Sequence, residues 1–401
     1  MLRTLSLLAL ITAAPSLRAA DPPPVDFNRD VLPLLSDYCF QCHGPDAKSR
    51  KAKLRFDDPK SPLDRAVIVP GKPRASAFVE RIASDDPDSV MPPPSLKRKL
   101  TAKQIELLTR WVAEGAKWSK HWAFEPMAKP EPPAPPKGEP RPQNPIDAFV
   151  RDRLAREKLR PAPPADKERL LRRVTFDLTG LPPTVAEIDA FLKDDAPEAY
   201  EKVVDRLLAS PRYGEQMASA WLDVARFADT HGYQMDRARP VWPYRDWVIS
   251  AFNRNLPFKD FVTWQLAGDL LPNPTKEQRL ATAFNRLHMQ NEEGGIVEEE
   301  FRVAYVNDRT TTFGTAFLGL TLECSRCHDH KFDPVSAKDY YQLFAFFQNI
   351  DESGQTSYFT AATPVPALML STDAQDARLG ELRKDVQSKQ LALAKNREAA
   401  R

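Results

Sequence analysis

Hydrophobic residues recur every three to four positions along most of the chain, the spacing of one face of an α-helix. The clearest example follows Thr101, which with Gln104 three positions later forms the capping box of a helix start. The apolar face of this helix comprises Ile105, Leu108, Trp111 and Val112. Gly115 suits the C-terminal cap.

Residues 146–350 repeat this helical pattern. Thr184 and Glu187 form a second capping box, ahead of a helix that carries Ile188, Phe191 and Leu192. Further apolar stripes begin at Ile146, Leu170 and Val203. The segment 221–227 is too densely apolar for a surface helix, so we expect it in the core. The chain is therefore predicted to be mainly α.

After residue 351 the pattern changes. We expect 354–370 to be irregular or extended, and 374–401 to form a charged helix. A weak heptad seam in this helix comprises Leu379, Leu382, Val386 and Leu393. Because the pattern runs to Arg401, we expect this helix either to meet a partner or to belong to a longer protein.

Proline is unusually frequent in the chain, with 38 residues compared with 14 glycines. Nine of the 20 residues from 126 to 145 are proline, which predicts an extended, semi-rigid linker. This gives a first domain at 21–125, the linker at 126–145, a larger helical domain at 146–350 and a C-terminal segment at 351–401. The net charge of +2 gives no reason to expect nucleic acid as a partner.

The N-terminus has the features of a secretory signal peptide over residues 1–20. Arg3 precedes a short apolar stretch from Leu5 to Ala14, and small residues follow, with cleavage expected after Ala19 or Ala20. The apolar stretch is too short to span a bilayer. We therefore expect export to the periplasm or an equivalent extracytoplasmic space, with no transmembrane segment in the mature chain.

All four cysteines belong to two identical patterns, Cys39-x-x-Cys42-His43 and Cys324-x-x-Cys327-His328. C-x-x-C-H is the attachment motif of c-type haem, in which two thiols add to the porphyrin vinyl groups and the histidine binds iron. Two disulfides or one Cys₄ zinc site are the alternatives, but neither requires a histidine after each second cysteine. The sequence predicts two haems c.

A c-type haem iron usually takes a sixth ligand from elsewhere in the chain. Met91, which begins a stiff Met-Pro-Pro-Pro stretch, is the candidate in the first domain, with a loop residue packed on the core as the alternative. His121 follows the capped helix and is interpreted as structural.

Several stretches resemble known families. Residues 27–46 (FNRDVLPLLSDYCFQCHGPD), 68–73 (IVPGKP), 91–94 (MPPP) and 121–124 (HWAF) resemble the planctomycete-type cytochrome c domain. Residues 221–230 (WLDVARFADT), 242–253 (WPYRDWVISAFN), 265–272 (QLAGDLLP), 291–295 (NEEGG) and 327–334 (CHDHKFDP) resemble the domain of unknown function that commonly follows it. The resemblance implies a small helical class I cytochrome c-like module and an exported, haem-linked role. Such proteins usually continue into another large C-terminal domain, which favours a fragment.

His288 is the leading candidate for the sixth ligand of the second haem, because it precedes the acidic Asn-Glu-Glu-Gly-Gly loop within a family-like stretch. A buried structural histidine is the equally weighted alternative. The other candidates are His231, Met217, Met235 and Met289. His330 is expected to support the site rather than bind iron.

The predicted function is electron transfer with periplasmic redox proteins. The alternative is a haem-dependent oxidoreductase that acts on an organic substrate or peroxide at the second haem. It depends on polar residues of the same domain converging near that haem, namely Asp229, Arg245, Glu292, Glu293, Asp308, Arg309, Asp329 and His330.

Overall fold

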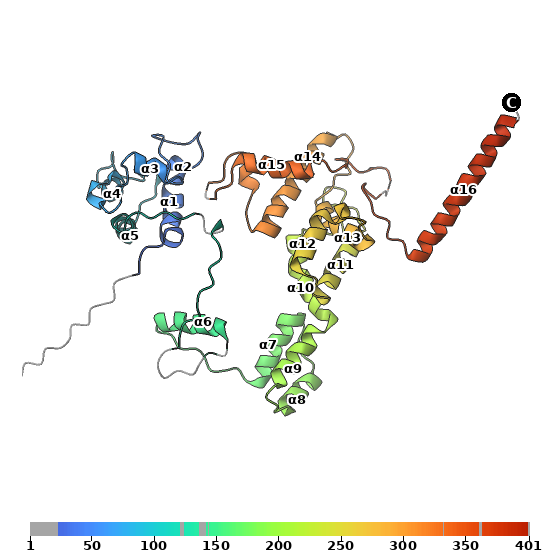
Figure 1. The fold of residues 1–401 in the computed structure, drawn as a ribbon, viewed down its shortest axis with the longest axis horizontal. Coiled ribbons are helices and arrows are strands. Elements are labelled where there is room, and N and C mark those ends of the chain that lie inside the picture. The colour runs from blue at the N-terminus through green and yellow to red at the C-terminus, as the bar shows by residue number, and fades with distance from the viewer. Residues whose placement is uncertain are drawn as a thin grey trace, which may run out of the picture. The chain divides into compact units, whose positions relative to one another are not determined.

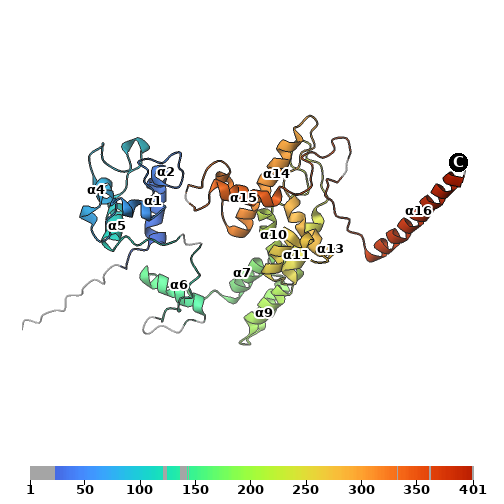
Figure 2. The same cartoon turned by 45° about the horizontal axis from the view of Figure 1, so that its top comes forward.

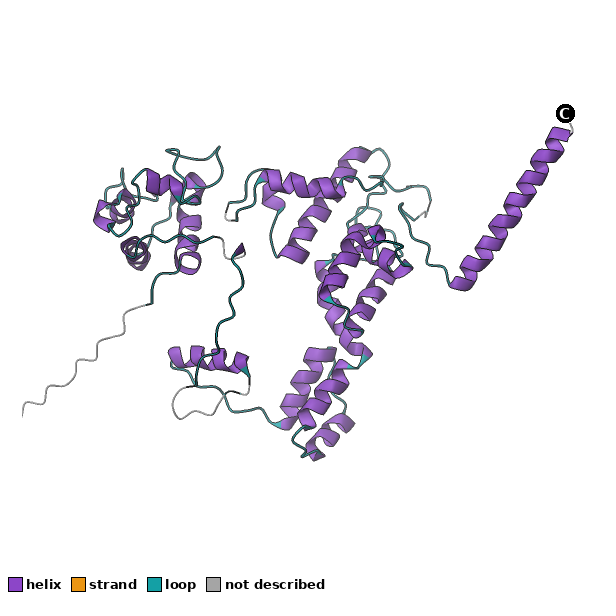
Figure 3. Ribbon diagram, in the orientation of Figure 1, coloured by secondary structure: helices purple, strands orange, loops and turns teal. Residues whose placement is uncertain are grey.

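The computed structural model describes residues 23–120, 124–135, 142, 144–331, 333–360 and 363–399. The predicted signal peptide and His121 lie outside these residues. Every element in the described part is a helix, and pairing of extended segments is limited to isolated bridges such as Gly232 with Gln290 (Figure 3). The prediction of a mainly α fold is confirmed. None of the described helices is long and apolar enough to cross a membrane.

The described chain divides into two compact units. One comprises residues up to 129 together with His328–Ser336, and the other comprises Pro130–Cys327 together with residues from Ala337 onwards. The boundary at 129 falls within the predicted proline-rich linker.

The first unit is a set of short helices, of which α1 to α5 are labelled in Figure 1. They are η1 (Phe27–Val31), α1 (Leu32–Tyr38), α2 (Phe40–His43), α3 (Lys60–Asp64), η2 (Pro73–Ala75), α4 (Ala77–Ala83), η3 (Pro94–Leu96) and α5 (Ala102–Ala113). The predicted capping box of Thr101 and Gln104 starts α5, and Gly115 takes the positive φ of +103° expected of a residue beyond its C-cap. Trp111 of α5 is buried and packs edge-on against Phe78 of α4.

The second unit begins with α6 (Pro145–Arg156) and a group of helices around Leu171. That group comprises α7 (Lys167–Thr179), α8 (Val185–Lys193), α9 (Ala199–Leu208) and α10 (Pro211–Val224). The Thr184–Glu187 capping box of α8 is confirmed. The apolar stripe of α6 is not part of a core. The side chains of Ile146 and Val150 are exposed.

The larger core of this unit forms around Trp247 and Phe261. It is built from α10, α11 (Trp242–Asn253), α12 (Phe258–Ala267), η5 (Gly268–Leu270), α13 (Lys276–Ala281) and η6 (Thr282–Arg286). Figure 2 shows α10 and α11 side by side. Trp221 and Ala225 pack in this core as predicted, whereas Val224 is exposed, since it lies to one side of the face that they form.

The remaining elements are α14 (Glu298–Phe313), η7 (Gly314–Leu318), η8 (Glu323–Arg326), α15 (Ala337–Phe347) and α16 (Asp373–Ala399). The helix predicted at 374–401 is confirmed up to Ala399 as α16, and residues 400 and 401 lie outside the described part of the chain. Its heptad residues Leu382, Val386 and Leu393 are exposed, and the coiled coil stays a prediction. The segment between α15 and α16 is irregular, apart from a bridge of Asn291 with Gln355.

Candidate functional site

The first cysteine motif lines a cavity of about 470 Å³ in the first unit. Cys39 follows α1, and Cys42 and His43 belong to α2. The amide of His43 donates to the carbonyl oxygen of Cys39 over 2.7 Å, so the motif is one helical turn. This turn places both thiols and the imidazole at the same cavity, as haem attachment requires.

His43 is fixed by the loop that follows it. Its carbonyl oxygen accepts from the amide of Phe56 over 2.8 Å, and its ring contacts the Phe56 ring edge-on at 5.7 Å. Burial lowers the pKa of His43, against the opposing effect of the nearby backbone of Lys51 and Leu54. A neutral imidazole with a free lone pair is the form that binds iron.

Met91 lines the same cavity. Its amide donates to the carbonyl oxygen of Arg81 in α4 over 2.9 Å, which fixes the start of the proline stretch. Its role as an iron ligand stays a prediction, but the structure brings Met91 and His43 to one cavity although 47 residues separate them in the chain (44–90).

The lining as a whole suits a porphyrin. Most of the cavity wall is apolar, with contributions from Leu54, Phe56, Val67, Phe78, Ile82 and Leu100. Burial raises the pKa of the Cys39 thiol to about 12, so this cysteine is protonated before it reacts. Thiols, an imidazole and a thioether in an apolar wall are the donor set of a haem c with His/Met ligation.

The second cysteine motif is exposed. Cys324 lies in η8, and the amide of Cys327 donates to its carbonyl oxygen over 3.3 Å. The corresponding contact in the first motif, from Cys42 to Cys39, is 3.1 Å, so both motifs adopt a similar turn. The Nδ1 atom of His328 lies 2.8 Å from the carbonyl oxygen of Asp329.

His330 next to this motif is buried. Its Nδ1 atom accepts from the amide of Asp333 over 2.9 Å, and the Asp333 carboxylate lies 3.4 Å away. The ring therefore holds the turn after the motif, and its supporting role at a haem stays a prediction.

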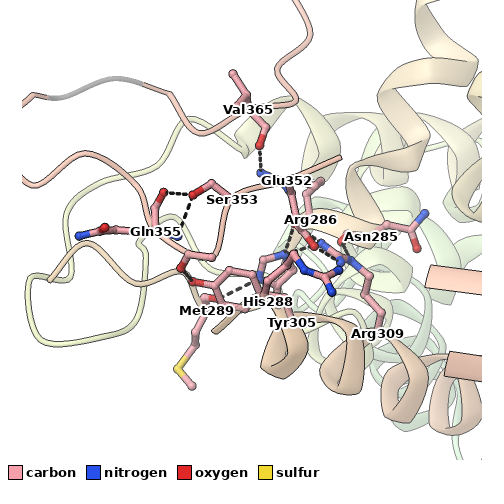
Figure 4. A network of polar contacts seen from close by, with 12 residues as sticks. Asn285, Arg286, His288, Met289, Tyr305, Arg309, Glu352, Ser353, Gln355 and Val365 are labelled. Atoms are coloured by element: carbon pink, nitrogen blue, oxygen red, sulfur yellow. Dashed lines mark hydrogen bonds and ion pairs between the residues drawn. The ribbon is translucent and has the colours of Figure 1, made fainter. Parts of the chain in front are cut away.

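His288 is also buried, but its ring nitrogens have protein partners (Figure 4). Nδ1 donates to the carbonyl oxygen of Met289 over 2.7 Å, and Nε2 accepts from Arg309 over 2.7 Å. The ring stacks on Tyr305 at 4.3 Å. Burial lowers the pKa of His288 to about 4, so it is neutral at pH 7. Its ligand role stays untested, and this geometry matches the alternative of a structural histidine.

Glu352 is the carboxylate at the centre of this network. It accepts from Arg309 and Arg286, and its side chain is fully buried (Figure 4). Burial alone would raise its pKa, but the neighbouring His288 ring at 3.6 Å and the hydrogen bonds from Arg309 outweigh this and lower it to about 2. The sequence reasoning missed Glu352 because it lies 64 positions after His288, in a segment with no periodic pattern.

A second buried polar group surrounds His231. Its Nε2 atom lies 3.1 Å from the Glu292 carboxylate, and both side chains are at most 6% exposed. Its Nδ1 atom has no hydrogen-bond partner among the described residues. Of the polar residues on whose convergence the oxidoreductase alternative depends, Asp308 pairs with Arg226 at 2.6 Å, whereas Arg245 pairs with neighbouring Asp246 at the surface.

Comparisons with known families agree with this architecture. Residues 39–95 match the model for planctomycete cytochrome C, the segment that forms most of the cavity wall. The first unit is therefore a c-type cytochrome domain, and this implies at least one haem c. Residues 145–352 match the model for a protein of unknown function, DUF1549. The chain belongs to this family, with the cytochrome domain ahead of it, as the resemblance predicted. No curated protein and no solved structure matches the chain.

Proposed function

We propose that the chain is an exported c-type cytochrome that carries two covalent haems and transfers electrons between extracytoplasmic redox proteins. The observation that carries the proposal is the single cavity lined by Cys39, Cys42, His43 and Met91. A haem bound there supplies one-electron chemistry. Cys39 and Cys42 would hold it covalently, and His43 and Met91 would supply the iron ligands.

The protein around this site favours electron transfer over ligand binding. With His43 and Met91 both as iron ligands, no site would be open for a small molecule, and the apolar wall would keep water away. Met/His ligation raises the reduction potential relative to bis-His ligation. The residues of the first unit therefore suit a carrier.

The second haem is proposed for Cys324, Cys327 and His328. The support is the repeated motif on a similar helical turn, with both thiols accessible for attachment. Export is proposed from the N-terminal sequence, and attachment of haem c to thiol pairs in export compartments is consistent with it.

The test is an intact-mass measurement on the full chain, produced with a c-type haem attachment system. We expect loss of the N-terminal segment and two covalent haems. Cys42→Ala should remove one haem and Cys327→Ala the other. A wild-type protein without covalent haem contradicts the function, and an unchanged count in Cys327→Ala contradicts the second haem.

The second candidate function is a haem-dependent oxidoreductase. It is favoured by the buried His231–Glu292 pair, because an unpaired Nδ1 on a carboxylate-bound imidazole suits proton transfer. In that case the iron bound by His328 has an open sixth position. A high-spin signal in electron paramagnetic resonance of the oxidised protein, together with turnover of peroxide that Glu292→Gln lowers, would select this candidate.

A further inference from the structure

The charged side chains that line the cavity of the first unit are all basic. Lys51, Arg65 and Arg81 contribute to its lining, whereas no aspartate or glutamate does. All three side chains are exposed, so they lie where the apolar cavity opens to solvent. Three cations around an apolar cavity indicate a ligand with an apolar body and anionic groups at one edge.

Their local contacts leave these charges available. Arg65 Nη1 donates to the carbonyl oxygen of Ala52 over 2.7 Å, which holds it beside the loop of Lys51. Arg81 belongs to α4, and its Nη1 lies 3.5 Å from the carbonyl oxygen of Ser89. In the described part of the chain, none of the three forms an ion pair with a carboxylate. Carbonyl contacts orient a guanidinium without neutralising it.

Several other cations of the first unit have an acidic partner. Arg55 pairs with Asp57, Arg29 pairs with Asp30, and Arg110 pairs with Glu114. The three cavity residues lack such a partner, and their position at the cavity sets them apart from other cations without an ion pair among the described residues, such as Arg74 and Lys103. A carboxylate ligand would provide that partner.

We propose that Lys51, Arg65 and Arg81 bind the two propionate carboxylates of the haem held by Cys39 and Cys42, and thereby raise its reduction potential. This rests on the proposed haem site. Oxidation adds one positive charge at the iron, so nearby cations disfavour the oxidised state. A unit charge at roughly 10 Å, with an effective dielectric of about 30, changes the oxidation equilibrium about three- to tenfold after screening.

The test compares charge-removing variants of the cavity residues with variants of exposed cations that do not line it. Arg65→Gln and Arg81→Gln are matched by Arg74→Gln, and Lys51→Gln is matched by Lys103→Gln. The haem count is read by mass, and the midpoint potentials are read by spectroelectrochemistry at fixed pH and low ionic strength. All these side chains are exposed, so each variant should fold.

We expect each cavity variant to keep its haem count and to favour the oxidised state of one haem about three- to tenfold, where tenfold corresponds to 59 mV. The shift should shrink at high salt, and the two control variants should match the wild type. Full haem counts with unchanged potentials in all three cavity variants overturn this inference and leave the cytochrome function intact. A wild type without covalent haem overturns both.

Discussion

The guanidinium of Arg309 donates to Nε2 of His288 over 2.7 Å inside the second unit. Nε2 is the acceptor of this pair, so its lone pair points at Arg309 rather than at open space. For His288 to bind an iron through this nitrogen, the Arg309 contact must break. Arg309 would then retain Glu352 as its partner.

His288→Ala tests the two roles of this histidine. As a structural residue, its loss leaves a buried gap and an unpaired Arg309 donor, and should cost about 2–4 kcal/mol of unfolding free energy. Denaturant unfolding measures this cost, with Met289→Ala at the exposed neighbour as the control. For a structural histidine, the electron paramagnetic resonance spectrum of His288→Ala should equal that of the wild type. A low-spin signal that becomes high-spin in His288→Ala would instead identify it as an iron ligand.

The lowered pKa of Glu352 predicts how the free energy of unfolding depends on pH. Its pKa is about 2 in the folded protein against 4.5 ordinarily, so the folded state binds this proton less readily than the unfolded state. The stabilisation is present above about pH 4.5 and is lost as pH falls towards 2, by roughly 3 kcal/mol. Glu352→Gln should lower stability at pH 7 and flatten the acid profile in this window.

The matched control for that series is Glu299→Gln. Glu299 pairs with Arg302 at 2.7 Å, but its side chain is 66% exposed. Its replacement should change stability by less than about 0.5 kcal/mol. Equal acid profiles for Glu352→Gln and the wild type would show that Glu352 is not the group that titrates.

Met91→Ala tests the sixth ligand of the first haem. Loss of the thioether should lower the potential of one haem and open its iron to carbon monoxide or cyanide, because an axial position becomes free. Ligand-binding spectra and redox titration measure both effects. Met127→Ala, at a fully exposed methionine, is the control. If the potential and the spectra stay unchanged, Met91 is a packing residue.

Gly354→Ala tests how the segment after α15 is held against α14. A Cβ atom at Gly354 would lie 1.8 Å from the carbonyl oxygen of Glu298, and the Gly354 carbonyl accepts from Tyr305 over 2.7 Å. The backbone must therefore shift, and we expect a loss of about 2–3 kcal/mol in denaturant unfolding. A Cβ atom at Gly294 would have nothing within 4 Å, so Gly294→Ala should leave the free energy of unfolding nearly unchanged. Equal stability of the two variants would show that this contact is not tight.

Local features were readable from the sequence. The capping boxes at Thr101 and Thr184 were predicted correctly because a cap depends on residues three positions apart. The mainly α fold and the cytochrome family followed from short periodic patterns and contiguous motifs in the same way. Each of these signals is contained within a few turns of chain.

The tertiary structure decided what long-range packing controls. The sequence by itself left His288 open between ligand and core residue, since its environment depends on Arg309 and on Glu352, 64 positions away. It also indicated an apolar stripe beginning at Ile146, and the structure leaves Ile146 and Val150 exposed. The basic residues at the cavity were equally hard to predict. Lys51, Arg65 and Arg81 line one cavity only after the chain folds around Cys39 and His43. The burial and the charge of a site depend on residues from distant segments of the chain, and no local sequence pattern encodes them.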